Sequence, residues 1–232
     1  MILVLVILVL ILFVAYVANR RKTLKKYWQT EYFAVTKQPY DRMRRNAGLN
    51  GEYSIYKSLS RLEGNRKFLF NCYLPKRDGT TSEIDLLLLH TSGIYVIESK
   101  NYSGWIFGRE SQAIWTQRFR NGHKERFYNP MMQNNSHIIW LKRLLPEVPE
   151  MAFRSIVVFS DHCSLKTDLS SKNHKVVHCC DVFEAVSSTA EQNVLTNAGV
   201  NAIFHKLYKF SQVSEITRFS HSTQVLADKE MG

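Results

Sequence analysis

An uninterrupted apolar run opens the chain and contrasts with the mixed pattern that follows it. Residues Ile2 to Ala18 contain no charged or strongly polar side chain. At 1.5 Å per residue they span roughly 26 Å, which suits a slightly short transmembrane helix. No basic residue precedes the run and no clear small-residue cleavage site ends it. The pattern therefore favours a membrane anchor over a cleaved signal peptide.

Two apolar segments around a short turn form the most regular pattern in the rest of the chain. Residues 83–89 and 93–100 read as the two strands of a β-hairpin. If His90 pairs with Gly93, antiparallel partners have residue numbers that add to 183. Both faces of the strands are apolar, which predicts central strands covered by helices on each side.

The other elements follow from periodicity and from start and stop signals. Asn129-Pro130 is typical of a helix start, and Pro146 ends that helix after about Leu145. We expect residues 105–107 and 113–119 to pair and to extend the sheet of the hairpin. The remaining predicted elements are helices at 48–62 and 201–210, a short helix capped by Asp181, and strands at 68–74, 153–159 and 175–178.

These elements divide the chain into four segments. We predict a transmembrane helix at 1–18, a basic juxtamembrane linker at 19–46, a folded α/β domain at 47–212 and a C-terminal tail at 213–232. The tail has little apolar pattern, so we expect a weakly held helix end followed by disorder.

Positive charge is concentrated next to the apolar run. The net charge is +11, and residues 19–46 carry +7 of it, from nine Lys and Arg against two acidic residues. Anionic lipid headgroups or a nucleic acid would each suit this segment, and its position favours the lipid interpretation. The positive-inside rule then places the N-terminus outside the cell membrane and the domain in the cytoplasm. Four cysteines without a C-x-x-C pair fit the reduced thiols of that compartment: Cys72, Cys163, Cys179 and Cys180.

The hairpin also carries the candidate chemistry. In the expected register Asp85 faces Glu98, with Cβ atoms roughly 5 Å apart. Lys100 shares the face of Glu98, because side chains alternate along a strand. Like charges placed opposite each other destabilise a sheet unless a positive group lies between them. Two carboxylates and an ammonium at one point predict a metal-dependent phosphodiesterase site, and a solvated strand end with a salt bridge is the alternative.

Oxygen ligands in this segment suit magnesium, with manganese as a substitute. Asp85 and Glu98 would supply carboxylates, and the carbonyl of Ser99 a third oxygen. Lys100 is expected to stay protonated beside two carboxylates, where it would orient the attacking water and stabilise the transition state.

Two residues on the predicted helices complete the candidate set. Glu52 would complete or hold the metal shell, although an acid near a helix N-terminus is also favourable because of the helix dipole. Gln133 would position a water or a phosphate, and it shares a helix face with His137, four residues later.

An ordered set of short motifs between residues 51 and 133 resembles the nuclease-related domain (NERD) family of the PD-(D/E)xK nuclease superfamily. The motifs are Gly51-Glu52, Ile84-Asp85, Gly93-Ile94-Tyr95-Val96-Ile97-Glu98-x-Lys100-Asn101-Tyr102-x-Gly104, Trp115 and Asn129-Pro130-x-x-Gln133. The resemblance implies a restriction-endonuclease-like fold, in which a central mixed β-sheet is flanked by helices. It also implies magnesium near Asp85 and Glu98, and active-site positions at Glu52, Asp85, Glu98, Lys100 and Gln133. Asp85 follows Ile84 rather than Pro, and no four-cysteine zinc finger follows the domain.

These observations lead to one main hypothesis and two rivals. The main one is a membrane-anchored, metal-dependent nuclease that hydrolyses phosphodiester bonds of DNA. The first rival is a non-catalytic nucleic-acid-binding or scaffolding module at the membrane. The second is a lipid-associated structural protein that acts through its basic linker. Tyr102, Trp105 and Trp115 would stack on bases or, as we favour, fill the core. The oligomeric state is left open.

Overall fold

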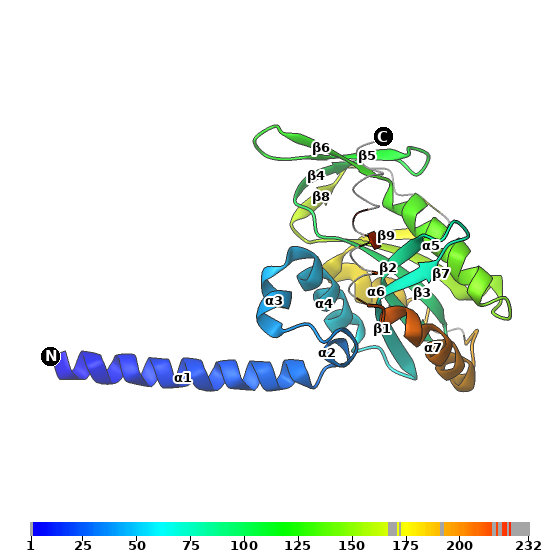
Figure 1. The fold of residues 1–232 in the computed structure, drawn as a ribbon. Coiled ribbons are helices and arrows are strands. Elements are labelled where there is room, and N and C mark those ends of the chain that lie inside the picture. Colours follow the sequence, from blue (N-terminus) through cyan, green and yellow to red (C-terminus); the bar gives the residue numbers. More distant parts are fainter. Residues whose placement is uncertain are drawn as a thin grey trace.

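Two mixed β-sheets and the helices around them form the body of the protein, and one long helix projects from it (Figure 1). The computed structural model describes residues 2–166, 171, 173–190, 193–214, 217, 220, 221 and 223.

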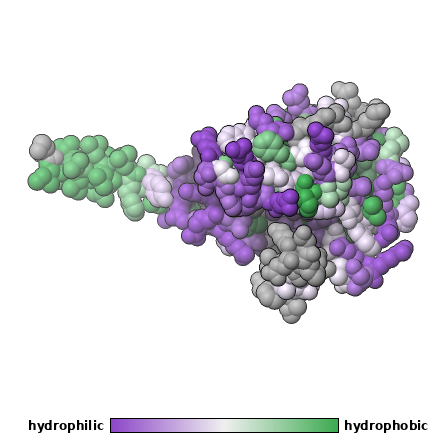
Figure 2. Space-filling model, turned by 90° about the horizontal axis from the view of Figure 1, so that it is seen from above, coloured by the Kyte–Doolittle hydropathy of each residue, from purple (hydrophilic) through white to green (hydrophobic). Residues whose placement is uncertain are grey.

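Helix α1 (Ile2–Trp28) is long and apolar enough to cross a membrane, a criterion that a signal sequence also meets. Its apolar side chains are exposed, and they form the hydrophobic arm beside the mainly hydrophilic body (Figure 2). The helix continues ten residues past the predicted boundary at Ala18. The basic residues that follow the apolar run are good helix formers, so nothing in the sequence ends the helix there.

The segment predicted as a linker is helical and packs onto the domain. It contains the end of α1 and helices α2 (Glu31–Thr36) and α3 (Tyr40–Arg45). Tyr27 and Tyr32 are fully buried, and the ring centroids of Tyr32 and Phe70 lie 4.8 Å apart. The basic segment is therefore anchored in the core by aromatic side chains that lie between its cationic residues.

The main sheet confirms the prediction of a central mixed β-sheet flanked by helices. Its strand order is β1-β2-β3-β7-β9, with β1, β2 and β3 antiparallel and β3, β7 and β9 parallel. Helices α4 and α6 contribute to the core on one face, and α5 and α7 on the other. The bounds are β1 (Arg66–Pro75), β2 (Thr81–His90), β3 (Gly93–Lys100), β7 (Phe153–Phe159), β9 (His174–His178), α4 (Ala47–Leu59), α5 (Pro130–Leu144), α6 (Val182–Ser187) and α7 (Asn197–Ser211).

Apolar residues on both faces of β2 explain why this sheet is covered on both sides. Leu86 and Leu88 pack in the cluster beneath α4, while Leu87 and Leu89 pack in the cluster beneath α5 and α7. Burying side chains on both faces requires a helical layer on each side, as the sequence pattern predicts.

Residues 105–107 pair with residues 116–118, as predicted, but they do so in a second sheet, so the prediction that this pairing extends the main sheet is wrong. This sheet has the order β6-β5-β4-β8, made of β4 (Gly104–Phe107), β5 (Ile114–Arg118), β6 (Lys124–Tyr128) and β8 (Cys163–Leu165). Gly104 has a φ of 77°, and a side chain there would collide with the carbonyl of Arg118. The chain can therefore turn out of the main sheet only because this residue is glycine.

Most of the predicted tail, residues 213–232, lies outside the described residues. Within it, His221 packs edge-on against Tyr73, with ring centroids 5.4 Å apart. Two short 3₁₀ turns, at Glu150–Ala152 and Cys179–Asp181, connect the remaining elements.

Candidate active site

The two strands that carry the candidate residues part from each other at the site. His90 pairs with Gly93, which confirms the predicted register, and the β2–β3 ladder ends at Leu86–Ile97. Beyond that pair β2 stays bonded to β1, and β3 stays bonded to β7 as far as Lys100. The strands therefore form a fork, and the expected pairing of the two acidic residues falls just past the end of the ladder.

Asp85 lies at the opening of this fork. Its Oδ2 accepts a hydrogen bond from the backbone N–H of Ser99 at 2.8 Å. The regular alternation of side chains along β2 is also interrupted here. Leu86 packs on the α4 side of the sheet, whereas Ile84, two residues earlier, packs on the α5 and α7 side. Opposite Asp85 on β1, Asn71 has a left-handed φ of 49° and makes no ladder pair. The local twist thus directs the carboxylate of Asp85 across the fork towards β3.

Glu98 lies at the centre of a network that joins β3 to α5. Lys100 Nζ donates to Glu98 Oε1 at 2.6 Å and to Gln133 Oε1 at 3.1 Å. On the other side, His137 Nε2 lies 3.3 Å from Glu98 Oε2, close but not aligned for a hydrogen bond. His137 Nδ1 is 2.7 Å from Ser82 Oγ. Helix α5 therefore fixes both the lysine and the carboxylate through two residues one turn apart.

The charges of Glu98 and Lys100 stabilise each other. Burial alone would raise the pKa of Glu98, but Lys100 and His137 together outweigh it and hold this pKa below its usual value. Burial would lower the pKa of Lys100, and the carboxylates of Glu98 and Asp85 instead raise it. The pair is therefore ionised at neutral pH.

The pKa values of Glu52 and Asp85, unlike that of Glu98, are raised. Burial, followed by the neighbouring charge of Asp85, raises the pKa of Glu52 well above its usual value. Burial and the charge of Glu98 do the same to the pKa of Asp85, against the opposing effect of Lys100 and the Ser99 N–H. Glu52 Oε2 is buried and has no hydrogen-bond partner in the described part of the chain.

The residues at the fork fit a bound divalent cation in charge and donor type. Three carboxylates, those of Glu52, Asp85 and Glu98, influence one another, and Lys100 is the one lysine or arginine paired with them among the described residues. No group of three or more His, Cys, Asp and Glu side chains in that part is arranged to hold a metal ion. Magnesium needs fewer than three such side chains, because it binds through one or two carboxylates together with waters and substrate phosphate.

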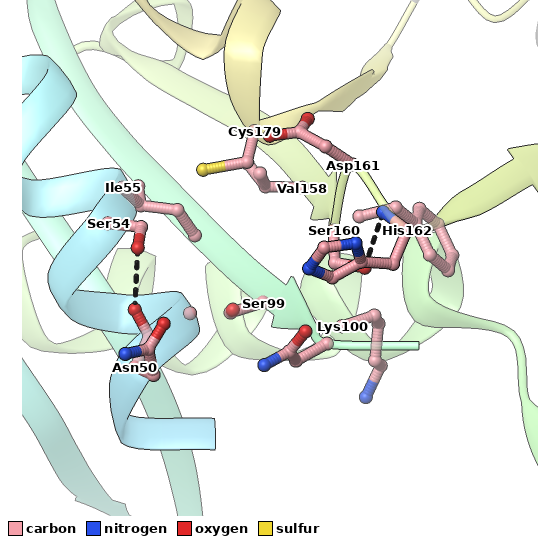
Figure 3. Close-up of a pocket in the computed structure, with 13 residues that line it drawn as sticks. Asn50, Ser54, Ile55, Ser99, Lys100, Val158, Ser160, Asp161, His162 and Cys179 are labelled. Carbon is pink, nitrogen blue, oxygen red and sulfur yellow. Dashed lines mark hydrogen bonds between the residues drawn. The ribbon is translucent and has the colours of Figure 1, made fainter. Parts of the chain in front are cut away.

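A polar pocket of about 130 Å³ opens beside the fork, at the carboxyl ends of β3 and β7. Asn50 and Ser54 of α4 line one wall, and Asp161 and His162 line another (Figure 3). Lys100 also lines this pocket, and its side chain extends away from α4 (Figure 3). The pocket thus offers room next to the candidate residues, and Glu52, Asp85 and Glu98 do not line it.

The five predicted residues lie together, from four elements: Glu52 on α4, Asp85 on β2, Glu98 and Lys100 on β3, and Gln133 on α5. The contact of His137 with Glu98 was not predicted, although the four-residue spacing of Gln133 and His137 contained the signal. Trp115 is fully buried and Tyr102 packs in the same core cluster, as favoured from the sequence. Trp105 is only half-buried and lies outside that cluster, so the expectation that it fills the core is wrong.

Comparisons with known proteins identify the family of the chain. The model of the nuclease-related domain matches residues 47–160, from the first residue of α4 to just past β7, so it includes all five residues. An uncharacterized protein of Bacillus anthracis is 33% identical over 165 residues, which covers 70% of this chain and 76% of the relative. No solved structure matches. The chain belongs to the nuclease-related domain family.

Proposed function

We propose that the protein is a membrane-anchored, magnesium-dependent nuclease that hydrolyses phosphodiester bonds of DNA. The observation that carries the proposal is the convergence of Asp85, Glu98 and Lys100 at the fork, with Lys100 bonded to both Glu98 and Gln133. A buried cluster of carboxyl groups beside a fixed ammonium suits the transfer of a phosphoryl group between oxygen atoms.

Each residue has a separate role in this proposal. Asp85, Glu98 and the Ser99 carbonyl would hold magnesium, with manganese as a substitute, and the ion would neutralise charge on the phosphate. Lys100 remains protonated and donates to the attacking water or to the phosphoryl oxygen. Gln133 keeps the lysine pointed at the fork, and Glu52 supports the acidic side of the site from α4.

The membrane part of the proposal rests on α1 and on the residues next to it. The exposed apolar run ends at a basic pocket between α1 and α3 that contains Arg20, Arg44 and Arg45. Basic side chains at that level suit anionic headgroups of the cytoplasmic leaflet. We therefore place the N-terminus outside and the nuclease domain in the cytoplasm.

Cleavage assays on the full chain in detergent test this function. Labelled DNA and RNA, single- and double-stranded, are incubated with the protein in magnesium, manganese or chelator. We expect metal-dependent cleavage of DNA that disappears in Asp85→Ala and in Lys100→Ala. Failure of the wild-type protein to cut any of these substrates in either metal would contradict the proposal.

A non-catalytic module that binds nucleic acid or a scaffold partner is the second candidate. It is favoured by the fact that Glu98 already has Lys100 and His137 at its two oxygens. In that case DNA binding would not depend on magnesium, and magnesium would leave the melting temperature of the protein unchanged.

A further inference from the structure

We propose that the outer face of the second sheet binds single-stranded nucleic acid and guides it to the fork. Guiding a strand to the fork is useful only if the proposed nuclease function holds, but binding to this face can be tested without cleavage. It assigns a partner to a surface that the site chemistry does not use.

The strand register places aromatic and cationic side chains together on this face. Trp105, Arg118 and Lys124 are consecutive cross-strand neighbours on β4, β5 and β6. Phe107 and Arg126 flank Thr116 in the next row of the same face. Because side chains in a row share one side of the sheet, aromatic rings of β4 lie beside cations of β5 and β6.

The opposite face of the same sheet packs against the body. Trp115 and Gln117 of β5 are buried, and Phe127 of β6 packs in the same core cluster as Trp115. The alternating residues of the outer face are therefore the ones left for a partner.

Exposure makes the rings available for stacking. Phe107 is 39% exposed and Tyr128 is 50% exposed, while Ile114, paired with Tyr128, is 49% exposed. Every nucleobase has an aromatic face, but in a duplex the neighbouring base pairs cover it. Exposed rings on the surface of a sheet thus select unpaired bases.

The cations of this sheet have no partner within the part of the chain that the structure describes. Arg118, Arg120, Lys124 and Arg126 are exposed and make no ion pair or side-chain hydrogen bond there. Residues 104–128 hold five Lys and Arg against two Glu, a net charge of +3. With the +7 of residues 19–46, this segment accounts for nearly all of the +11 of the chain.

The chain connects this surface to the reacting groups on both sides. Lys100 precedes β4 by four residues, and Gln133 follows the end of β6 by five. In Figure 1, β5 and β6 lie at the end of the body away from α1, so the second sheet lies at a distance from the membrane anchor. A strand bound there would pass the fork without meeting the bilayer.

Charged residues also protect an edge strand such as β6 from aggregation, which is the plainer explanation of Lys124 and Arg126. That explanation does not require exposed aromatic residues in the neighbouring rows. It predicts that removing the charges changes solubility and leaves nucleic-acid binding intact.

The test measures binding by the full chain in detergent and in chelator, so that no cleavage intervenes. The probe is a fluorescent oligothymidylate, and its anisotropy is followed at several salt concentrations. The patch variant combines Arg118→Ser, Lys124→Ser and Arg126→Ser. The control variant removes three exposed cations elsewhere: Lys57→Ser, Arg77→Ser and Lys209→Ser.

We expect the patch variant to bind at least about tenfold more weakly, with a salt slope smaller by about 2, at roughly 0.7 per lost phosphate contact. The control variant should bind like the wild-type protein. Phe107→Ser with Tyr128→Ser should weaken binding about tenfold with the salt slope unchanged, while Tyr208→Ser should not.

Equal binding by the patch and control variants would overturn the inference. So would equal affinity of the wild-type protein for the single strand and for a duplex of the same length. Loss of binding to anionic lipid vesicles, rather than to the oligonucleotide, would assign the surface to a membrane instead. If patch-dependent binding is found in a protein that cuts nothing, the inference stands and the proposed nuclease function fails.

Discussion

The carboxylate of Asp85 accepts a hydrogen bond from the Ser99 N–H at 2.8 Å, across the point where β2 and β3 separate. This bond replaces the backbone pairing that the ladder loses there. It also fixes Asp85 next to Glu98, although the two carboxylates repel each other. An unfavourable pairing is thus maintained by the fold at the place where a metal ion would relieve it.

Asp85→Asn should show separately how the repulsion between Asp85 and Glu98 affects stability and how it affects cleavage. The amide oxygen can still accept from Ser99, and the neutral side chain no longer opposes Glu98. We expect the metal-free variant to be more stable at pH 8, by on the order of 1 kcal/mol, and to lose cleavage. Magnesium should raise the melting temperature of the wild-type protein and not that of the variant. A variant with lower metal-free stability would contradict this explanation.

Lys100→Met should destabilise the protein because it leaves Glu98 buried without its closest cation. We expect a loss of about 3 kcal/mol in the free energy of unfolding, measured by denaturant titration. Adding Glu98→Gln should restore much of that loss, since the uncompensated charge is removed. Neither variant should cut DNA. If the double variant is as unstable as the single one, the two residues are not coupled through charge.

Gln133→Ala should affect activity more than stability. The side chain is only partly buried, and its contact is the hydrogen bond from Lys100 at 3.1 Å. We expect kcat to fall about tenfold or more, because the lysine is no longer held in place, with KM nearly unchanged. The free energy of unfolding should change by less than about 1 kcal/mol. Asn135→Ala on the same helix serves as the matched control.

His90 should make stability depend on pH near the hairpin turn. Burial lowers its pKa, and the ring contacts the Glu63 carbonyl and the Ser92 hydroxyl. The unfolded chain therefore takes up a proton at higher pH than the folded protein does. The contribution of His90 is present above about pH 6.5 and is lost as the pH falls below it. His90→Gln should show a shallower fall in melting temperature between pH 7 and 5.5 than the wild-type protein.

Truncation should reveal where the folded body begins. Tyr27 and Tyr32 are fully buried in the cluster beneath the main sheet. A protein that starts at residue 27 should fold, whereas one that starts at residue 47 should lose several kcal/mol of stability. Circular dichroism melts of the two proteins provide the comparison. Equal melting temperatures would show that the aromatic contacts contribute little.

Local signals in the sequence predicted much of this fold. A two-residue turn fixes the register of its hairpin, so the pairing of His90 with Gly93 followed directly. Asn129-Pro130 marked the start of α5, and the apolar residues on both faces of β2 required helices on both sides. The hairpin register, the start of α5 and the covering of β2 each depend on residues close together in the sequence or on the pattern of one strand.

Contacts between distant segments were harder to predict. The second sheet depends on the positive φ at Gly104, which glycine permits but does not demand. The packing of Tyr27 and Tyr32 was hidden by the cations around them. At the fork, β2 remains paired with β1 while β3 remains paired with β7. The point at which β2 and β3 separate therefore depends on their other neighbours and cannot be predicted from the sequences of β2 and β3 alone.

Single-turnover cleavage of labelled DNA, titrated with magnesium, tests the central claim most directly. The wild-type protein is compared with Asp85→Asn and with Glu63→Gln, which removes an exposed carboxylate remote from the fork. We predict saturable magnesium-dependent cleavage by the wild-type protein and by Glu63→Gln, and none by Asp85→Asn. Cleavage by Asp85→Asn with the same magnesium dependence as the wild-type protein would contradict the account.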